Sequence, residues 1–314
     1  GGDQAVVKRV NKIEYYGGKM QTVEKSNKGK SRVVAYALKQ LIEQSKRVVI
    51  MGHMHPDMDC FGAALGIHRV CIMCDRPAYI LINEVTESLM DIYRQAKESE
   101  KYQFINSKKA ESITDKDTLV VLVDTHRPSY AEHGVLLSMT DRIVVIDHHR
   151  RAEDAVENPT LSYIESYASS TAELVAEMLQ YIAPKKTLIK LEAEALLAGM
   201  TVDTNRFAVK TGVRTFEAAA WLRRSGADTA EVKRFFQVDM ENFKLRAKCI
   251  AAAEFHEGGI AVSICEGLNE DAQVINSQVA DELLTIKGIR ASFVAGRTVQ
   301  GNTVISARSL GEVN

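Results

Sequence analysis

Short apolar runs that stop at metal-binding side chains constrain this chain more than any other feature. The runs 47–52, 119–123 and 143–146 consist largely of valine, isoleucine and leucine, and polar residues bound each of them. Continuous runs of this kind are typical of strands that are buried on both faces of a parallel sheet. In an open α/β sheet, ligands bind just outside the carboxyl ends of the strands. The sequence therefore predicts a binding site at one edge of such a sheet.

Strand and helix patterns alternate from residue 47 to about residue 165, which predicts an α/β fold with a doubly wound, mainly parallel sheet. An amphipathic helix is expected before this region, over 31–46. Ser170 with Glu173 fits a capping box at the start of a further helix. Within the alternating region we expect strands at 47–52, 78–82, 118–124 and 142–147, and helices near 60–73, 86–99 and 129–138.

Both ends of the chain differ from this central pattern. Residues 1–30 predict a small hairpin and then a linker, and residues 188–257 have a helical pattern. Beyond residue 257 we expect a second, smaller α/β domain with strands at 260–265, 291–296 and 304–307 and a helix near 271–286. The predicted parts are therefore an N-terminal segment at 1–30, a main domain at 31–238, a linker helix at 239–257 and the second domain at 258–314.

The composition limits the kinds of partner that the chain can have. Forty basic and 41 acidic residues give a net charge of −1. This balance argues against non-specific electrostatic binding of long nucleic acids and favours a small substrate. No apolar stretch reaches the roughly 20 residues that a membrane helix needs. The cysteines are odd in number and scattered, so we expect reduced thiols of a cytosolic protein. They are Cys60, Cys71, Cys74, Cys249 and Cys265.

The densest group of candidate metal ligands follows the first apolar run, in the pattern His53-x-x-x-Asp57-x-Asp59. Alternate carboxylates in such a loop can point toward two neighbouring ions. Two ions about 3.5–4 Å apart need a shared ligand, and Asp124, at the end of a central strand, is the expected bridge. The predicted metal ligands are His53, Asp57, Asp59, Asp124, His148 and Asp203.

Two imidazoles and four carboxylates are too many ligands for one ion and suit two. Oxygen-rich ligation with some imidazole favours Mn²⁺ and leaves Fe²⁺, Co²⁺ or Mg²⁺ as alternatives. A water between two such cations loses a proton and becomes a nucleophile, so we expect a metal-bridging hydroxide to attack a phosphoester. Asp124, as the bridge, belongs to the predicted catalytic residues.

Adjacent histidines cannot easily ligate the same ion. If His148 is the metal ligand, His149 faces the substrate, where it can contact the phosphate or protonate the leaving oxygen. Asp147 is expected to orient the His148 ring without binding the metal itself. His149 is therefore both a predicted catalytic residue and a predicted substrate-binding residue.

Together these motifs resemble the DHH phosphoesterase superfamily, which is named after the triplet Asp147-His148-His149. Ile305-Ser306-Ala307-Arg308-Ser309 looks like part of the DHH-associated substrate domain. The loop at 52–59 looks most like that of the GdpP-type cyclic-di-AMP phosphodiesterases. In that branch Gly1-Gly2-Asp3-Gln4 would be the tail of a degenerate GGDEF domain.

The resemblance implies how the residues divide their roles. His53, Asp57 and Asp124 would hold one ion, and Asp59, Asp124, His148 and Asp203 would hold the other. Arg308 and Ser309 would face the substrate. The family's second domain also carries a glycine-rich stretch that ends in His, and the sequence stops at Asn314, before such a stretch.

The implied reaction is the Mn²⁺-dependent hydrolysis of cyclic-di-AMP to linear pApA, in bacterial second-messenger signalling. The sequence leaves the choice between cyclic-di-AMP and cyclic-di-GMP open. A homodimer is expected, in the cytoplasm. The family resemblance also implies a full-length protein that N-terminal helices anchor to the membrane.

Two other functions remain open from the sequence. A DHH-type oligoribonuclease acting on short RNAs or on pApA would use the same metal chemistry. A cyclic dinucleotide sensor without turnover would have kept the fold, but every expected metal position is filled here, which disfavours it.

Overall fold

The computed structural model describes residues 4–9, 12–17, 28–183, 187–237, 239–269 and 272–310. These residues form two compact units, Gly1–Phe236 and Gln237–Asn314, and each is described by itself. At the N-terminus, β1 (Gln4–Arg9) pairs with β2 (Lys12–Gly17) in an antiparallel hairpin, as the sequence predicts. Residues 1–3 of the predicted GGDEF tail at 1–4, and most of the predicted linker, lie outside the described residues.

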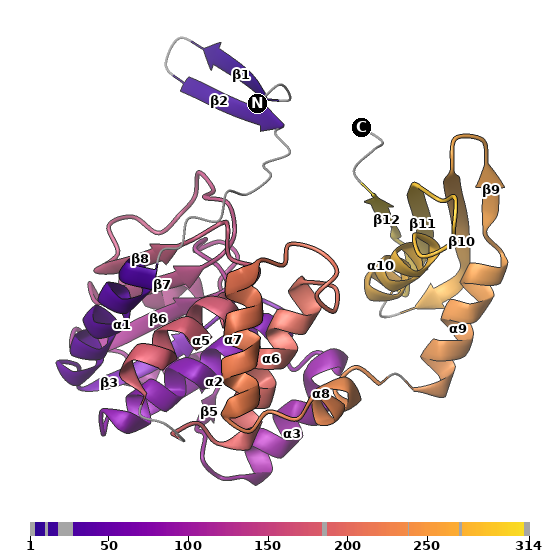
Figure 1. Ribbon diagram of the computed structural model, residues 1–314. Coiled ribbons are helices and arrows are strands. Elements are labelled where there is room, and N and C mark those ends of the chain that lie inside the picture. The colour runs from indigo at the N-terminus through magenta and orange to yellow at the C-terminus, as the bar shows by residue number, and fades with distance from the viewer. Residues whose placement is uncertain are drawn as a thin grey trace. The chain divides into compact units, whose positions relative to one another are not determined.

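A six-stranded parallel sheet forms the centre of the first unit, in the order β5-β4-β3-β6-β7-β8 (Figure 1). Every neighbouring pair is parallel, so the predicted α/β fold with a doubly wound sheet is confirmed. The strands are β3 (Arg47–Met51), β4 (Ala78–Leu81), β5 (Phe104–Ile105), β6 (Thr118–Val123), β7 (Ile143–Asp147) and β8 (Leu161–Ile164).

Alternate side chains of the sheet enter two separate apolar cores. In β3, Val48 and Ile50 join the larger core, whereas Val49 and Met51 join the smaller one on the opposite face. The larger core lies under α1 (Lys28–Glu43), α2 (Met58–Met73), α3 (Met90–Glu98), α5 (Thr171–Ile182), α6 (Lys190–Asp203), α7 (Val213–Arg224) and α8 (Thr229–Arg234). The smaller core lies under α4 (Ser107–Ile113) and the 3₁₀ helix η2 (Gly134–Ser138), and a second 3₁₀ turn, η1 (Glu87–Leu89), precedes α3.

Helices α2 and α6 pack so closely that two glycines are required between them. A Cβ atom on Gly62 would lie 2.4 Å from the Ala195 carbonyl oxygen, and one on Gly199 would lie 2.8 Å from the Cα atom of Asp59. Real Cβ atoms do not approach other atoms so closely. The glycines therefore let α6 come close to the start of α2, where Asp59 lies.

Several predicted elements differ from those observed. The helix expected at 129–138 is wrong except for the short η2, because the chain there pairs with the loop after β3: the amide of Glu132 donates to the Gly52 carbonyl at 2.8 Å. The sequence prediction also lacked α4 and the two edge strands β5 and β8. Edge strands bury less surface, so their apolar patterns are weak.

The second unit is a four-stranded sheet with two helices. The strand order is β12-β11-β10-β9, and β10 and β11 are parallel. The expected linker helix ends earlier than residue 257, because Glu254–His256 pairs with β10. The elements are α9 (Met240–Ala251), β9 (Glu254–His256), β10 (Ile260–Asn269), α10 (Ala272–Leu283), β11 (Ala291–Thr298) and β12 (Thr303–Ser309).

Two of the five cysteines form a disulfide, which contradicts the prediction that all are reduced. Cys249 on α9 and Cys265 on β10 have Cα atoms 5.0 Å apart, because the helix packs directly on the strand. This separation is within the range that a disulfide requires. Cys60, Cys71 and Cys74 are free thiols, as expected.

Within the described parts of the chain, no helix combines the length and the apolar character that crossing a bilayer requires.

Candidate metal centre

The candidate site lies where the order of the parallel strands reverses. From β3 the chain builds the sheet toward β4 and β5, and from β6 it builds in the opposite direction toward β7 and β8. Ligands bind at such a switch point, outside the carboxyl ends of the strands. His53 follows β3 and Asp124 follows β6, so the backbone itself brings them to this point.

The first cluster of candidate ligands consists of His53, Asp57 and Asp124. The Nε2 atom of His53 lies 3.8 Å from Oδ1 of Asp57 and 3.5 Å from Oδ2 of Asp124. Its other ring nitrogen, Nδ1, is 2.8 Å from the Met54 carbonyl oxygen, which can only accept a hydrogen bond. In the neutral ring the proton is therefore on Nδ1, and the lone pair of Nε2 faces the two carboxylates.

Asp57 has a structural role as well as a place in this cluster. It is the N-cap residue of α2, and its Oδ1 atom accepts hydrogen bonds from the amides of Asp59 and Cys60 at 2.9 and 3.0 Å. A capping carboxylate at a helix N-terminus satisfies amides that have no partner inside the helix. Helix α2 therefore fixes the position of Asp57 relative to His53.

The second cluster consists of Asp59, His148 and Asp203. The Nε2 atom of His148 lies 3.0 Å from Oδ2 of Asp203 and 3.8 Å from Oδ2 of Asp59. It is nevertheless a buried nitrogen without a hydrogen-bond partner among the described residues. Such atoms are rare in native proteins, and a buried imidazole nitrogen of this kind fits a metal ligand.

The start of α5 holds Asp59 in place. The amides of Thr171 and Ala172 donate to the two oxygens of the Asp59 carboxylate at 2.7 and 2.8 Å. Ser170 caps the helix by accepting from the amide of Glu173, as predicted, while the Glu173 carboxylate accepts from Ser169 instead of closing the capping box on Ser170. The positive N-terminal end of α5 therefore faces the carboxylate of Asp59, which is fully buried.

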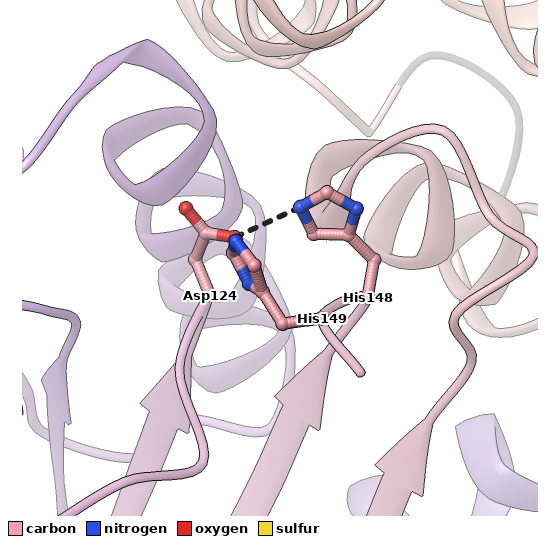
Figure 2. Close-up of side chains that lie close together, drawn as sticks. All are labelled: Asp124, His148 and His149. Carbon is pink, nitrogen blue, oxygen red and sulfur yellow. Dashed lines mark ion pairs between the residues drawn. The ribbon is translucent and has the colours of Figure 1, made fainter. Parts of the chain in front are cut away.

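Asp124 lies between the two clusters. Its Oδ2 atom is near His53, and its Oδ1 atom is 3.5 Å from Nε2 of His148 (Figure 2). The hydroxyl of Thr171 donates to Oδ1 at 3.0 Å and so fixes the direction of the carboxylate. Asp124 has a φ angle of 59°, in the left-handed region that non-glycine residues rarely adopt. Strain of this kind concentrates at functional sites.

Burial and charge repulsion disfavour the ionised form of two carboxylates in the site, Asp59 and Asp124. Burial, together with the neighbouring charges of Asp124 and Asp203, raises the pKa of Asp59 well above its usual value, and burial also raises the pKa of Asp124. Burial would lower the pKa of His53, but the contacts with Asp124 and Asp57 outweigh it and raise that pKa to about 11. Cations at this place would relieve the same repulsion without protons.

His149 lies beside these clusters but differs from their members in exposure. Its side chain is 55 % exposed, whereas that of His148 is 5 % exposed. Figure 2 shows both rings next to Asp124, and the Nδ1 atom of His149 is 3.8 Å from the Oδ1 atom of that carboxylate. The exposed ring is the one that a substrate can reach.

The predicted partner of Asp147 is wrong. Asp147 was expected to orient His148, but its Oδ1 atom accepts a hydrogen bond from Nδ1 of His149 at 2.8 Å, and its Oδ2 atom contacts His126. His148 instead faces Asp124, at 3.5 Å between Nε2 and Oδ1. The hydrogen bond that His149 donates to Asp147 raises the pKa of His149.

The predicted substrate residues of the second unit lie at the end of β12. The Nε atom of Arg308 donates to Oδ1 of Asp281 on α10 at 2.9 Å, and its guanidinium also contacts Ser277. Arg308 is thus held by its own unit, and the substrate-binding role of Arg308 and Ser309 stays a prediction.

Sequence reasoning missed three residues that shape the site. Thr171, Gly199 and His126 contact Asp124, Asp59 and Asp147 respectively. His126 follows Asp124 by two residues at the same strand end, so the rule that selected Asp124 was a usable signal for it. No local pattern indicates Thr171 or Gly199, because each contacts a residue that is distant in the sequence: Thr171 contacts Asp124, and Gly199 contacts Asp59.

Comparison with known proteins identifies relatives of this chain. Residues 47–200 match the DHH family, N-terminal domain. The chain is 44 % identical over 320 residues to the cyclic-di-AMP phosphodiesterase GdpP of Geobacillus thermodenitrificans, covering 100 % of this chain and 48 % of that protein. It is 42 % identical over 321 residues to the Bacillus subtilis protein of the same name, covering 100 % and 49 %. The chain thus spans about half the length of these curated relatives.

A solved structure has a similar fold. The exopolyphosphatase-related protein of Bacteroides fragilis superposes with a TM-score of 0.76 at 18 % identity, over 90 % of this chain and 84 % of that one. At this identity the likeness supports the fold and carries no information about the substrate.

Proposed function

The chain belongs to the DHH family, and we propose that it is the catalytic region of a metal-dependent phosphodiesterase that hydrolyses cyclic-di-AMP to linear pApA. The observation that carries the proposal is the Asp124 carboxylate, whose two oxygens face two separate clusters of candidate ligands. A carboxylate shared in this way is what a two-metal site for phosphoester hydrolysis requires.

The residues fit two divalent cations. The Nε2 atom of His53, which faces two carboxylates, the buried Nε2 atom of His148, which has no hydrogen-bond partner among the described residues, and four carboxylates within reach are a donor set for ions. We propose that His53, Asp57 and Asp124 hold one cation, and that Asp59, Asp124, His148 and Asp203 hold the other. The mixture of oxygen and imidazole ligands supports Mn²⁺, with Fe²⁺, Co²⁺ or Mg²⁺ as alternatives.

Bound cations would supply the Lewis acidity that activates a water and neutralises the phosphoryl oxygens. The chain's own residues orient the carboxylates and the imidazole that take part in the reaction. Thr171 and the start of α5 fix Asp124 and Asp59 before any substrate arrives. His149 donates from Nδ1 to Asp147, which leaves its Nε2 atom to contact a phosphate or to transfer a proton to the leaving oxygen.

The identity of the substrate rests on the relatives, which carry the name cyclic-di-AMP phosphodiesterase. We propose that the second unit contributes Arg308 and Ser309 to substrate binding, and that the site prefers adenine over the guanine of cyclic-di-GMP. A homodimer and membrane anchoring of a longer, cytoplasmic-facing protein are further proposals, to be tested by light scattering and by fractionation of the full-length protein.

Hydrolysis of cyclic-di-AMP beside linear pApA, with and without Mn²⁺, tests the proposed reaction. We expect Mn²⁺-dependent conversion of the ring to pApA with little further breakdown. Rapid cleavage of pApA to AMP with an untouched ring would identify an oligoribonuclease instead. Tight binding of cyclic-di-AMP with no product under any metal would identify a sensor.

A further inference from the structure

One buried carboxylate holds two histidines at the edge of the site. The Oδ1 atom of Asp147 accepts hydrogen bonds from Nδ1 of His149 at 2.8 Å and from its amide at 3.1 Å. The Oδ2 atom of Asp147 contacts Nδ1 of His126. Asp147 is completely buried, so its direction depends on these partners and not on solvent.

The protonation of His126 is fixed from both sides. A carboxylate can only accept from Nδ1 when it is ionised, whereas the amide of Ala152, 2.7 Å from Nε2, can only donate. His126 therefore donates from Nδ1 to Asp147 and accepts at Nε2 from Ala152. Both nitrogens are used, and the side chain is 2 % exposed, so His126 is available neither as a metal ligand nor as a contact for substrate.

The backbone around His126 also fastens the loop that follows the two site histidines. The His126 carbonyl accepts from the amide of Val156 at 2.8 Å, and the Arg127 guanidinium donates to Asp154 at 2.8 Å. These bonds hold the loop independently of the His126 ring. The contact between the ring and Asp147 is therefore separable from the fastening of the loop.

We propose that His126 is a positioning residue for His149, acting through Asp147; the inference rests on the proposed phosphodiesterase function. The proton on Nδ1 of His126 occupies one oxygen of Asp147, which leaves the other oxygen aimed at Nδ1 of His149. This arrangement sets the tautomer and the direction of His149, so that Nε2 faces the substrate. Without the His126 donor, Oδ2 of Asp147 is a buried acceptor without a partner, and the carboxylate gains by turning toward other donors.

Two near-isosteric variants separate the two nitrogens of His126. In His126→Asn, the amide nitrogen takes the place of Nδ1 and still donates to Asp147, but nothing accepts from Ala152. In His126→Gln, the amide oxygen takes the place of Nε2 and still accepts from Ala152, but Asp147 loses its donor. A role in positioning His149 predicts that asparagine rescues function, whereas a role in fastening the loop predicts that glutamine does.

The first measurement is kcat and KM for cyclic-di-AMP, with Mn²⁺ binding measured by calorimetry on the same samples. We expect His126→Gln to lower kcat about 10- to 100-fold, in the range found when a partner behind an active-site ligand is removed. His126→Asn should retain kcat within about threefold. Both variants should bind Mn²⁺ as the parent does, because the hydrogen bonds of the His126 ring go to Asp147 and Ala152, which are not candidate metal ligands. Equal losses in both variants, or recovery in His126→Gln alone, would overturn the proposal.

A double-mutant cycle with His149→Ala adds a readout that a merely structural role would not change. If His126 acts through His149, His126→Gln should cost less than about threefold in kcat once His149 is absent. A full additional loss in that background would show that His126 acts elsewhere. A crystal structure of His126→Gln should show the hydrogen bond between His149 and Asp147 broken, and an unchanged bond would also contradict the proposal.

The parent chain distinguishes failure of this inference from failure of the proposed function. If the parent binds two Mn²⁺ but does not hydrolyse cyclic-di-AMP, the proposed function is wrong, and the crystal structure of His126→Gln still tests the link to His149. If the parent is active and both variants behave alike, the inference alone is wrong.

Discussion

Removing one hydroxyl should weaken the metal site measurably. Thr171 is fully buried, and its hydroxyl makes a 3.0 Å hydrogen bond to the Asp124 oxygen that faces His148. Thr171→Val keeps the shape of the side chain and removes this donor. Hydrogen bonds to charged groups contribute about 1.5–3 kcal/mol. Since about 1.4 kcal/mol corresponds to a factor of ten, the expected loss of Mn²⁺ affinity is roughly 10- to 100-fold.

Calorimetric titration of Mn²⁺ into the parent, Thr171→Val and the matched control Thr171→Ser measures this loss. The serine variant keeps the hydroxyl and should bind Mn²⁺ within about threefold of the parent, because the hydrogen bond is retained. Thermal melts of the metal-free proteins exclude unfolding as the cause. Parent-like affinity in Thr171→Val would show that Asp124 needs no orienting donor, and the argument for a prearranged bridge would then be wrong.

Three further predictions follow from particular contacts. Gly199→Ala should weaken Mn²⁺ binding and lower the unfolding free energy by about 1–3 kcal/mol, because its Cβ would lie 2.8 Å from Asp59 Cα; a urea melt equal to the parent's would contradict the packing argument. Asp57→Ala and Asp124→Ala should both abolish hydrolysis with the fold intact, but circular-dichroism melts should show a loss of about 1 kcal/mol in Asp57→Ala, which removes the α2 cap. Burial, together with the charge of Arg69, lowers the pKa of His68 to about 4. In the unfolded chain this histidine binds a proton below about pH 6.5, whereas in the folded chain it binds one only below about pH 4. Stability should therefore fall as pH decreases through that interval, by up to about 1.4 kcal/mol per pH unit, and His68→Phe should lack this component; identical pH slopes in both proteins would refute it.

The sequence was most informative where one rule governed both the backbone and the site. The runs before His53 and Asp124 are buried on both faces, so their continuous apolar pattern predicts strands as well as the sheet end at which ligands gather. That reasoning also predicts which side chains meet, since parallel neighbours end at the same edge. It could not predict β5, which has two residues, nor the loop at 129–133, which pairs with the segment after β3 instead of forming a helix.

The hydrogen-bond partners of Asp147 and Asp124 could not be predicted from the sequence, for a physical reason. Asp147 is adjacent to both His148 and His149, and only the turn of the backbone decides which ring it reaches. The donor to Asp124 comes from the first residue of α5, and it is fixed by how α5 crosses the sheet. Such contacts depend on tertiary packing, which a local pattern does not encode. The disulfide between Cys249 and Cys265 is of the same kind, because it follows from the packing of α9 on β10.

Anomalous diffraction from crystals grown with Mn²⁺ would show whether two cations share the Asp124 carboxylate. We expect two manganese peaks per chain about 3.5–4 Å apart, one between His53 and Asp57 and one near His148, with Asp124 in contact with both. A single peak, or two peaks of which one lies away from Asp124, would contradict the dinuclear site and the reaction proposed for it.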